Sequence, residues 1–487
     1  MGKRWGEWVI RFRWPIVLIM PILMLAFAYG ASKLSWRTDY RAFFSPQNPE
    51  LQAFEKMQRI FNKSDSLVFV VAPASGTVFD RDTLKAIEEL TDGGWQLHLS
   101  TRVDSLRNYQ HTTAVGDDLE VRDLYEDPEN LSDAELLKIK QIALNEPLIV
   151  RRLVSDKGDV AAVNVTFELP DNPANEIPTI AKQARELAHK VEQAHPGLKI
   201  HMTGVVMMNA AFREASEHDF KTLVPIMFAV VVVMLWLTTR IHFGVVTTVL
   251  VIAFSIAAAM GLAGWLGFYM TGPTASAPII ILTMGVADAV HLLIGYLHFL
   301  QQGLRRKAAM IESVRVNFQP VLLTSVTTVV GFLSMNFSEV PPFRDLGNIV
   351  AFGVGFAWLL TTTFLPALMV MLPIRVPKIH PDDSPLMERV ADFVIRHRTA
   401  LLWGVTGLVL ASLAGIPKNE LDDQFVQYFD KSVPFRQATD FANERLAGIY
   451  TIEYALDSGQ KGGISEPKFL QEVDAFVEWA RQQKEVR

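Results

Sequence analysis

Residues Thr274–Gln301, with the sequence TASAPIIILTMGVADAVHLLIGYLHFLQ, form the stretch that decides the fold. A helix needs about 20 apolar residues to cross a bilayer, and this stretch is long and apolar enough to do so. It also carries Asp288 and His291 near its middle. An ionisable group at the centre of a membrane helix costs at least about 2.5 kcal/mol, so a polar partner, a water path or a transported ion must offset that cost.

The polar residues of this predicted helix share one side. Residues three and four apart lie on the same face of a helix, so Asp288, His291, Gly295 and His298 form one stripe of polar and small side chains. Structural roles stay open for two of them: Asp288 as a carboxylate hydrogen-bonded to a neighbouring helix, and His291 as a packing histidine. His298 is expected near the inner interface, with its polar end in water.

The composition of the chain is typical of a membrane protein with a polar insert. Half of its 487 residues are hydrophobic (50%), and they are unevenly spread along the chain. The net charge of −6 gives no electrostatic support for a nucleic-acid partner. The absence of cysteine excludes disulfides and thiolate metal sites.

Seven stretches are predicted to cross the membrane. They are Trp14–Ala31, Phe220–Leu237, Phe243–Phe268, Thr274–Leu300, Phe318–Phe337, Leu346–Leu372 and Ala400–Ala414. A cleaved signal peptide is the alternative for the first stretch, but the same pattern recurs in mid-chain, where no signal peptide lies. Residues 1–13 before it predict an amphipathic helix at the membrane interface.

Basic residues orient these spans. If the amino terminus is cytoplasmic, the Lys and Arg residues that flank the spans fall on the cytoplasmic side: Lys3, Arg4, Arg11, Arg13, Arg240, Arg305, Arg306, Lys307, Arg315, Arg375, Lys378, Arg389, Arg396 and Arg398. The positive-inside rule then places the long insert Leu34–Asp219 outside the cytoplasm. The segment Arg305–Arg315 is predicted as an interfacial helix at anionic headgroups.

The sequence of the insert predicts an α/β domain. Predicted strands alternate with predicted helices, which favours split βαβ units of the ferredoxin-like kind. The strands are Ser66–Pro73, Val160–Leu169 and Leu198–Thr203, and the helices are Asp80–Leu90, Ser132–Asn145 and Ala174–Ala194. A capping box, Ser132 to Glu135, opens the second helix.

An internal repeat is the second strong signal. The segment Val394–Phe429 echoes Val9–Phe44, and IYTIEYALDSG from Ile449 echoes SLVFVVAPASG from Ser66, both at an offset of about 385 residues. A second copy therefore begins near Leu386. We expect the chain to be one full half of a duplicated protein plus the opening of the next half. A chance likeness of apolar helices is the alternative, but strand and loop motifs repeat as well.

These observations predict seven parts in chain order. They are an interfacial helix (1–13), a first transmembrane helix (14–33), an extracytoplasmic α/β domain (34–219), transmembrane helices two to six (220–373), a cytoplasmic linker with an interfacial helix (374–397), a seventh transmembrane helix (398–415) and the start of a second extracytoplasmic domain (416–487).

The order of these parts and three local motifs resemble the resistance–nodulation–division (RND) superfamily. Gly285–Leu292 (GVADAVHL) is similar to the fourth-span motif of its MMPL and sterol-sensing branch. Pro320–Leu333 is similar to the fifth span, and Phe343–Gly347 with Leu365–Leu368 to the sixth. The resemblance implies an RND-type helical bundle with an outer α/β porter domain and an exporter of hydrophobic or lipid-like molecules, in which acids on the fourth span carry protons.

The sequence departs from that motif at one position. The first acidic position of the family falls on Ala287, and Asp288 occupies the second. We expect Asp288 and His291 to be the proton relay. Burial disfavours the charged form of a carboxyl group, so a buried carboxylate can take up a proton as well as release one. A histidine on the same face can hold the released proton. Thr324 and Thr328 on the fifth span, and Asn348 on the sixth, are the predicted neighbours of Asp288, with ordinary packing of small residues as the alternative.

No enzyme, metal or cofactor motif is present in the sequence, and no nucleotide-binding loop. The sequence thus predicts a transporter in the inner membrane, driven by the proton motive force, with protons, membrane lipids and a hydrophobic or lipid substrate as partners. A homo-oligomer or a periplasmic partner is left open. Two other functions also remain: a sterol-sensing-like lipid receptor or scaffold, and a helper of protein translocation.

Overall fold

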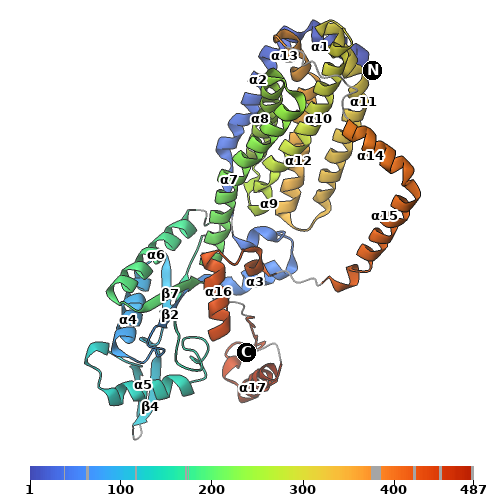
Figure 1. Ribbon diagram of the computed structural model, residues 1–487. Helices are drawn as coiled ribbons and strands as arrows, with labels where there is room; N and C mark the ends of the chain where they lie inside the picture. Colours follow the sequence, from blue (N-terminus) through green and yellow to red (C-terminus); the bar gives the residue numbers. More distant parts are fainter. Residues whose placement is uncertain are drawn as a thin grey trace. The chain divides into compact units, whose positions relative to one another are not determined.

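The computed structural model describes residues 1–37, 39–61, 65–115, 118–170, 173, 175–374, 385–419, 424–448 and 452–483. The chain divides into two compact units (Figure 1). The helical unit contains Met1–Ser35 and Glu217–Gln427, and the α/β unit contains Trp36–Ser216 and Tyr428–Arg487.

The helical unit is a bundle whose long helices match the predicted spans. Its elements are α1 (Gly2–Arg11), α2 (Arg13–Ala28), most of α7 (Val205–Thr239), α8 (His242–Trp265), β8 (Tyr269–Met270), α9 (Gly272–Ala275), α10 (Ala277–Gln301), α11 (Arg306–Leu333), α12 (Pro341–Thr362), α13 (Phe364–Met371), α14 (Pro385–Arg396) and α15 (Arg398–Leu413). Among the described residues, seven helical segments are long and apolar enough to cross a membrane. This agrees with the prediction of a multi-pass membrane protein.

Two spans begin earlier than the sequence predicts. The second belongs to α7, which starts at Val205, and the fifth belongs to α11, which starts at Arg306. The basic segment expected as a separate interfacial helix is thus the first part of α11. Its apolar side, including Ala309, Met310 and Val314, is buried in the bundle, so the helix continues into the span without a break. Residues 375–384, which include the predicted Arg375 and Lys378, lie outside the described residues.

Glycines of α8 bring it into contact with α2 and with the turn that directly follows α2. A Cβ atom at Gly261 would lie 2.0 Å from the Phe27 carbonyl oxygen, and one at Gly264 would lie 2.0 Å from the Gly30 carbonyl oxygen. Backbone atoms cannot move aside as side chains do, so only glycine permits this approach. Gly355 on α12, in contrast, has no atom within 4 Å of such a Cβ position.

This difference predicts unequal effects of the same substitution. Gly261→Ala should destabilise the bundle by about 1–3 kcal/mol, because the added methyl group forces α2 and α8 apart. Gly355→Ala adds a methyl group in open space and should be neutral or slightly stabilising. Thermal unfolding of the detergent-solubilised variants measures both, and equal melting temperatures would contradict the close packing at Gly261.

The first helix packs on the bundle through a narrow glycine face. Positions Gly2 and Gly6 lie against Arg315, Ile311 and Val314 of α11. The Trp5 indole donates a hydrogen bond of 3.1 Å to the Thr362 carbonyl. The amphipathic helix predicted at residues 1–13 is present, and one of its sides is joined to the bundle by these contacts.

The α/β unit is built on a four-stranded antiparallel sheet with the strand order β3-β6-β2-β7. Its elements are β1 (Ser35–Trp36), α3 (Pro49–Phe61), β2 (Asp65–Pro73), α4 (Arg81–Trp95), β3 (Ser100–Asp104), β4 (Gln110–Val115), β5 (Asp118–Asp123), α5 (Asp133–Asn145), β6 (Ala161–Phe167), α6 (Glu176–Ala194), β7 (Leu198–Thr203), α16 (Pro434–Arg445) and α17 (Pro467–Arg481). Because β6 lies between β3 and β2, and β2 lies between β6 and β7, the strands form two split βαβ units, as predicted.

The two faces of this sheet have different covers. Val165 on β6 pairs with Leu67 on β2 and with Val103 on β3, and this face carries α4, whose Gly94 lies against Val103 and Val165. The side chains of Leu67, Val103 and Val165 are buried there. The other face carries alternate residues such as Ser66 and Thr166, and we call it the open face. Strand alternation therefore separates a core face covered by α4 from the open face, which carries both polar and apolar side chains.

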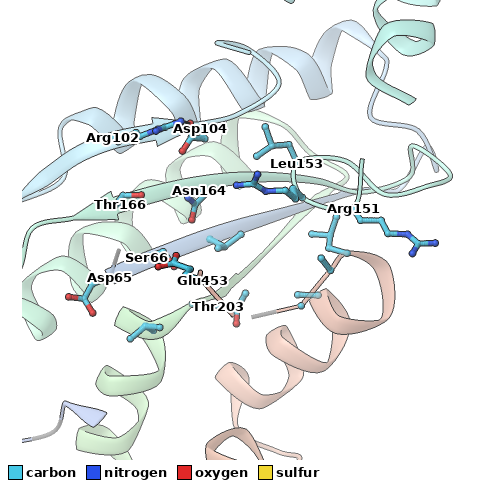
Figure 2. A pocket seen from close by; sticks show the side chains of 18 of the residues that line it. Asp65, Ser66, Arg102, Asp104, Arg151, Leu153, Asn164, Thr166, Thr203 and Glu453 are labelled. Carbon is cyan, nitrogen blue, oxygen red and sulfur yellow. Dashed lines mark hydrogen bonds and ion pairs between the residues drawn. The ribbon is translucent and has the colours of Figure 1, made fainter. Parts of the chain in front are cut away.

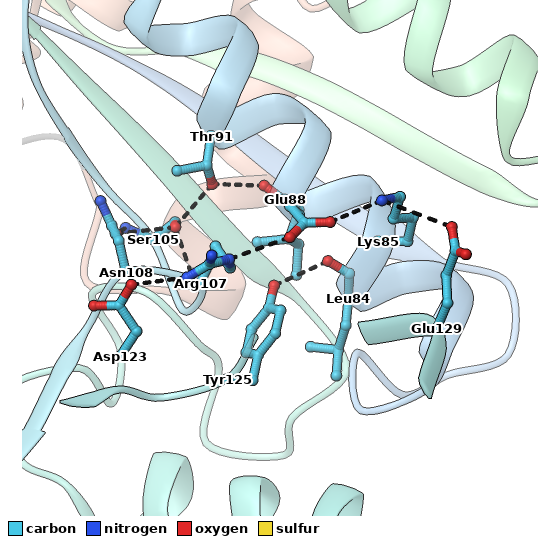
Figure 3. A network of polar contacts seen from close by, with 11 residues as sticks. Leu84, Lys85, Glu88, Thr91, Ser105, Arg107, Asn108, Asp123, Tyr125 and Glu129 are labelled. Atoms are coloured by element: carbon cyan, nitrogen blue, oxygen red, sulfur yellow. Dashed lines mark hydrogen bonds and ion pairs between the residues drawn. The ribbon is translucent and has the colours of Figure 1, made fainter. Parts of the chain in front are cut away.

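A hairpin of β4 and β5, which the sequence analysis does not predict, is tied to α4 by a polar network (Figure 3). The Arg107 guanidinium donates hydrogen bonds to Glu88 on α4 at 3.3 Å and to Asp123 on β5 at 2.8 Å. The Tyr125 hydroxyl donates to the Leu84 carbonyl at 2.9 Å, and burial raises the pKa of Tyr125 well above its ordinary value. Charge-assisted bonds of this kind fix the base of the hairpin against the domain.

The internal repeat is visible in the secondary structure. Helix α15 begins 385 residues after α2 and has the same length of 16 residues. Helix α16 begins 385 residues after α3. The echo from Ile449 falls partly outside the described residues, and residues 452–458 adopt no regular structure.

Helix α16 covers one half of the open face. The Thr203 and Thr439 hydroxyls are hydrogen-bonded at 2.7 Å, and the His201 and Phe441 rings stack with centroids 4.5 Å apart. Val70 and Ala162 of the sheet form an apolar cluster with Ala442 and Leu446 of the helix. The helix of the second copy that corresponds to α3 is thus packed on the sheet of the first copy.

This contact predicts a pH-dependent stability. Burial, followed by the charge of Lys199, lowers the pKa of His201 below its ordinary value of 6.5. The folded protein therefore favours neutral His201, so this stabilisation is present above pH 6.5 and is lost as the pH falls below it. The variant His201→Phe keeps an aromatic ring stacked on Phe441 but has no imidazole to protonate. When the pH is lowered from about 7.5 to about 5.5, its melting temperature should fall less than that of the wild type. Equal losses in the two proteins would contradict the assignment.

Candidate functional site

Asp288 lies inside the helical unit, near the middle of α10. Its side chain is buried, with 7% of the residue exposed. The Ser325 hydroxyl of α11, itself buried, donates a hydrogen bond of 2.9 Å to Asp288 Oδ2. A buried carboxylate requires such partners, and α11 supplies one at the same depth.

The residues of the predicted stripe on α10 differ in their exposure. His291 is exposed on the surface of the helical unit, as is Ala287, whereas Asp288 is buried. Among the described residues, no hydrogen bond joins His291 to Asp288. His298 is exposed, and its ring is hydrogen-bonded to the Gln302 amide at 2.8 Å. The relay role predicted for Asp288 and His291 stays a prediction.

The predicted neighbours of Asp288 on the other helices differ from those in the structure. The Thr324 hydroxyl is exposed and donates to the Pro320 carbonyl of its own helix at 2.8 Å, and Thr328 is half-buried. Ser325 occupies the place predicted for Thr324, because one residue along a helix turns the side chain by about 100°. Ser325 could have been considered as a neighbour of Asp288 from the sequence, because it stands next to Thr324 in the same hydroxyl-rich span.

Asn348 lies in a different contact. Its amide exchanges two hydrogen bonds with the Asn336 amide, each 2.9 Å long. Close packing of Gly347 against the Phe332 carbonyl, 2.3 Å from its ideal Cβ position, holds these two segments together. Asn348 therefore links the start of the sixth span to the end of the fifth through hydrogen bonds. The sequence predicted it beside Asp288.

Further polar groups lie between α10 and α11. The Ser313 hydroxyl donates to the Leu292 carbonyl at 2.7 Å, and the ideal Cβ position of Gly295 lies 2.8 Å from Ser313 Oγ and 2.7 Å from Asn317 Nδ2. The Tyr296 hydroxyl is fully buried and has no hydrogen-bond partner among the described residues. Buried polar atoms of this kind require a partner such as water. These residues could not be predicted from the sequence, because Ser313 lies in the segment expected at the interface and Asn317 lies just before the predicted fifth span.

The α/β unit contains a groove on the uncovered half of its open face (Figure 2). The groove has a volume of about 1200 Å³. Its floor carries the polar side chains of Ser66, Asn164 and Thr166, which lie side by side across β2 and β6. Its lining also includes an apolar group from α3, formed by Phe54, Met57 and Phe61. The groove is therefore amphipathic, with a polar floor on the sheet and an apolar wall on α3.

One end of the groove holds a buried ion pair. Arg41 contacts Asp65, which is 2% exposed, at 3.2 Å and donates to Gln58 at 3.1 Å. Burial raises the pKa of the neighbouring Tyr40 to about 12, so its hydroxyl stays protonated at neutral pH. The Gln58 contact attaches the inner side of α3 to this cluster.

Comparison with known proteins places the chain in a family. A family model described as the MMPL family matches residues 42–397. A putative membrane protein of Methanocaldococcus jannaschii, MJ1562, is 22% identical over 371 residues, which cover 73% of this chain and 90% of that protein. The hopanoid transporter HpnN of Rhodopseudomonas palustris is 28% identical over 232 residues, covering 46% of this chain.

A third relative is an exporter by name. The siderophore exporter MmpL5 of Mycobacterium tuberculosis is 21% identical over 280 residues, or 56% of this chain. The matched regions span only 26% of HpnN and 29% of MmpL5. Since the family model spans well over half of the sequence, the chain belongs to the MMPL family of membrane proteins.

Proposed function

We propose that the chain is part of an RND/MMPL-type secondary transporter that exports a hydrophobic or lipid-like substrate and is driven by the proton motive force. The observation that carries this proposal is Asp288, a buried carboxylate at the middle of a membrane-spanning helix. Intramembrane carboxylates are costly and commonly form ion or proton pathways. The names of HpnN and MmpL5, a hopanoid transporter and a siderophore exporter, support transport as the activity.

In the proposed cycle, Asp288 takes up a proton from the outer side and releases it to the inner side. The Ser325 hydroxyl donates to the ionised carboxylate and would turn to accept a hydrogen bond from the protonated one. One charge crossing the membrane field yields about 2.3 kcal/mol per 100 mV, enough to shift a bundle between two arrangements. The polar groups at Ser313, Asn317 and Tyr296 support a wet route from Asp288 toward the Arg306 end of α11.

The groove of the α/β unit would receive the substrate. Its apolar wall on α3 suits a hydrocarbon body, and its polar floor suits a polar head group, as in an amphipathic ligand. This role requires the α/β unit to lie outside the cytoplasm, as the positive-inside rule predicts.

Reconstitution distinguishes this proposal from its two alternatives. Proteoliposomes that contain the full-length protein and a fluorescent lipid should lose that lipid from the accessible leaflet faster when a proton gradient is imposed. A lipid receptor or scaffold would bind the lipid equally with and without the gradient. A translocation helper would show a secretion defect on deletion while lipid export stays unchanged. Either of these two results would overturn the proposal.

A further inference from the structure

Helix α1 and the first ten residues of α11 form a basic surface at the end of the bundle where α13 lies (Figure 1). The two helices run antiparallel, because Gly2 lies against Arg315 and Gly6 lies against Ile311. Together these segments carry six basic residues and two acidic ones, Glu7 and Glu312. The basic residues, all exposed, are Lys3, Arg4, Arg11, Arg306, Lys307 and Arg315. We call these six residues the basic surface.

Most of the positive charge on this surface has no acidic partner. Among the described residues, Arg315 pairs with Glu312, and the other five basic residues make no ion pair. The Arg306 guanidinium donates a hydrogen bond of 3.2 Å to a backbone carbonyl, that of Leu372. Exposed cations that are not neutralised within the protein attract anionic partners, and at a membrane surface they attract anionic lipids.

Exposed aromatic rings lie beside these cations on α1. Trp8 is 48% exposed and Phe12 is 40% exposed. The Arg11 guanidinium lies 5.7 Å from the centre of the Phe12 ring. Tryptophan is enriched at the depth of lipid headgroups, where its ring meets hydrocarbon and its N–H group meets water. In a chain that crosses a membrane, an anionic phospholipid therefore accounts for both the cations and the rings.

The buried side of α1 contacts a break in the sixth span. Helix α12 ends at Thr362 and α13 begins at Phe364. Because Pro366 has no N–H group, the Thr362 carbonyl four residues earlier lacks its helical donor. The Trp5 indole donates a hydrogen bond of 3.1 Å to this carbonyl. A side chain of α1 thus replaces the backbone hydrogen bond that the proline removes.

This break is connected to the helix that carries Asp288. On one side of the break, Val9 of α1 packs on Ala367 of α13. On the other side, Ala357 of α12 lies against α10, with its Cβ atom 3.6 Å from the ideal Cβ position of Gly285. Gly285 precedes Asp288 by three residues, less than one helical turn. A change at the break therefore reaches α10 through direct contacts.

We propose that the basic surface binds the headgroups of anionic phospholipids, and that Trp5 transmits this binding to the break in the sixth span. A bound headgroup holds α1 against the bundle and keeps the Trp5 hydrogen bond in place. Without the lipid, α1 separates more often, the Thr362 carbonyl loses its donor, and the break becomes more flexible. The inference goes beyond the proposed transport, because neither lipid binding nor flexibility at the break requires export.

Lipid binding tests the surface. The full-length protein in a neutral detergent is titrated with fluorescent phosphatidylglycerol and with fluorescent phosphatidylcholine. The paired change Arg4→Gln and Arg11→Gln should weaken phosphatidylglycerol binding by about tenfold or more, since each basic residue at an anionic surface contributes about fivefold. The matched pair, Lys56→Gln and Arg59→Gln, removes the same charge from exposed positions on α3 and should have little effect. Equal losses in the two pairs, or equal affinities of the wild type for the two lipids, would overturn the proposal.

Hydrogen exchange tests the link to the sixth span. In nanodiscs, the amides of Phe364–Met371 in the wild type should exchange about fivefold more slowly when the bilayer contains phosphatidylglycerol than when it is pure phosphatidylcholine. Trp5→Phe keeps an aromatic ring but has no N–H group to donate, so it should bind phosphatidylglycerol and lose this lipid dependence.

Trp8→Phe is the matched control for this measurement. The Trp8 indole is exposed and makes no hydrogen bond among the described residues, so the lipid dependence should remain in this variant. The link through Trp5 is wrong if Trp5→Phe keeps the lipid dependence, or if the wild type shows none.

Discussion

Asp288→Asn is expected to reduce proton-driven export by roughly 100-fold or more, the scale of effect seen when a proton-transfer group is removed. Asparagine has nearly the same shape and can still accept the hydrogen bond that the Ser325 hydroxyl donates at 2.9 Å. It cannot take up or release a proton. The substitution therefore separates packing from titration better than alanine would, because alanine would also leave a cavity beside Ser325.

Export is measured as lipid loss from proteoliposomes under an imposed proton gradient. Asp288→Glu is the matched control, since it keeps a titratable group and should retain part of the rate. Binding of the same lipid without a gradient should be unchanged in Asp288→Asn, which shows that the protein is folded. If Asp288→Asn exported at the wild-type rate, Asp288 would not be the group that couples protons to export.

Ser325→Ala is expected to lower the proton-driven export rate by about tenfold. The buried carboxylate would lose its hydrogen-bond donor on α11, and hydrogen bonds to charged groups contribute about 1.5–3 kcal/mol. Ser325→Thr keeps the hydroxyl and should recover most of the rate.

Thr324→Ala is the matched control for this prediction. The Thr324 hydroxyl bonds within its own helix and is exposed, so its loss should leave the export rate within about twofold, because substitutions of exposed residues usually have little effect. The reverse order, with Thr324→Ala the slower variant, would show that the sequence-based choice of Thr324 was right and that Ser325 is only a packing residue.

Comparison of the sequence predictions with the structure shows where each kind of signal is informative. The long apolar spans and the strand at Ser66–Pro73 were predicted because apolar patterns of the right length fix these elements. The capping box of Ser132 and Glu135 was predicted at the residues where the structure has it, because a capping box is a local interaction.

Other elements carry weaker patterns. Of the five residues in β3 (Ser100–Asp104), the only buried one is Val103, so no alternation of apolar residues marks the strand. Both β4 and β5 are largely exposed and rely on each other and on the Arg107 network. Tertiary contacts, which a single sequence does not display, determine these strands.

Only part of the candidate site could be predicted, because tertiary contacts determine the rest of it as well. Asp288 stands out because a charge in an apolar span is costly wherever the span packs. The residue that bonds to Asp288 depends on how α11 is rotated about its own axis relative to α10. A change of one residue along α11 brings Ser325 to Asp288 in place of Thr324. Neither Ser313 nor Tyr296 could be assigned, because a serine or a tyrosine in a span is common and only the packing shows that it is buried.

The central claim is that Asp288 carries protons while the bundle moves substrate, and proton movement tests it directly. Proteoliposomes that hold the full-length protein and a pH-sensitive dye are given an exportable lipid under an imposed proton gradient. The account predicts lipid-dependent proton movement through the wild type and none above the leak through Asp288→Asn. Equal lipid-dependent proton movement through both proteins would contradict it.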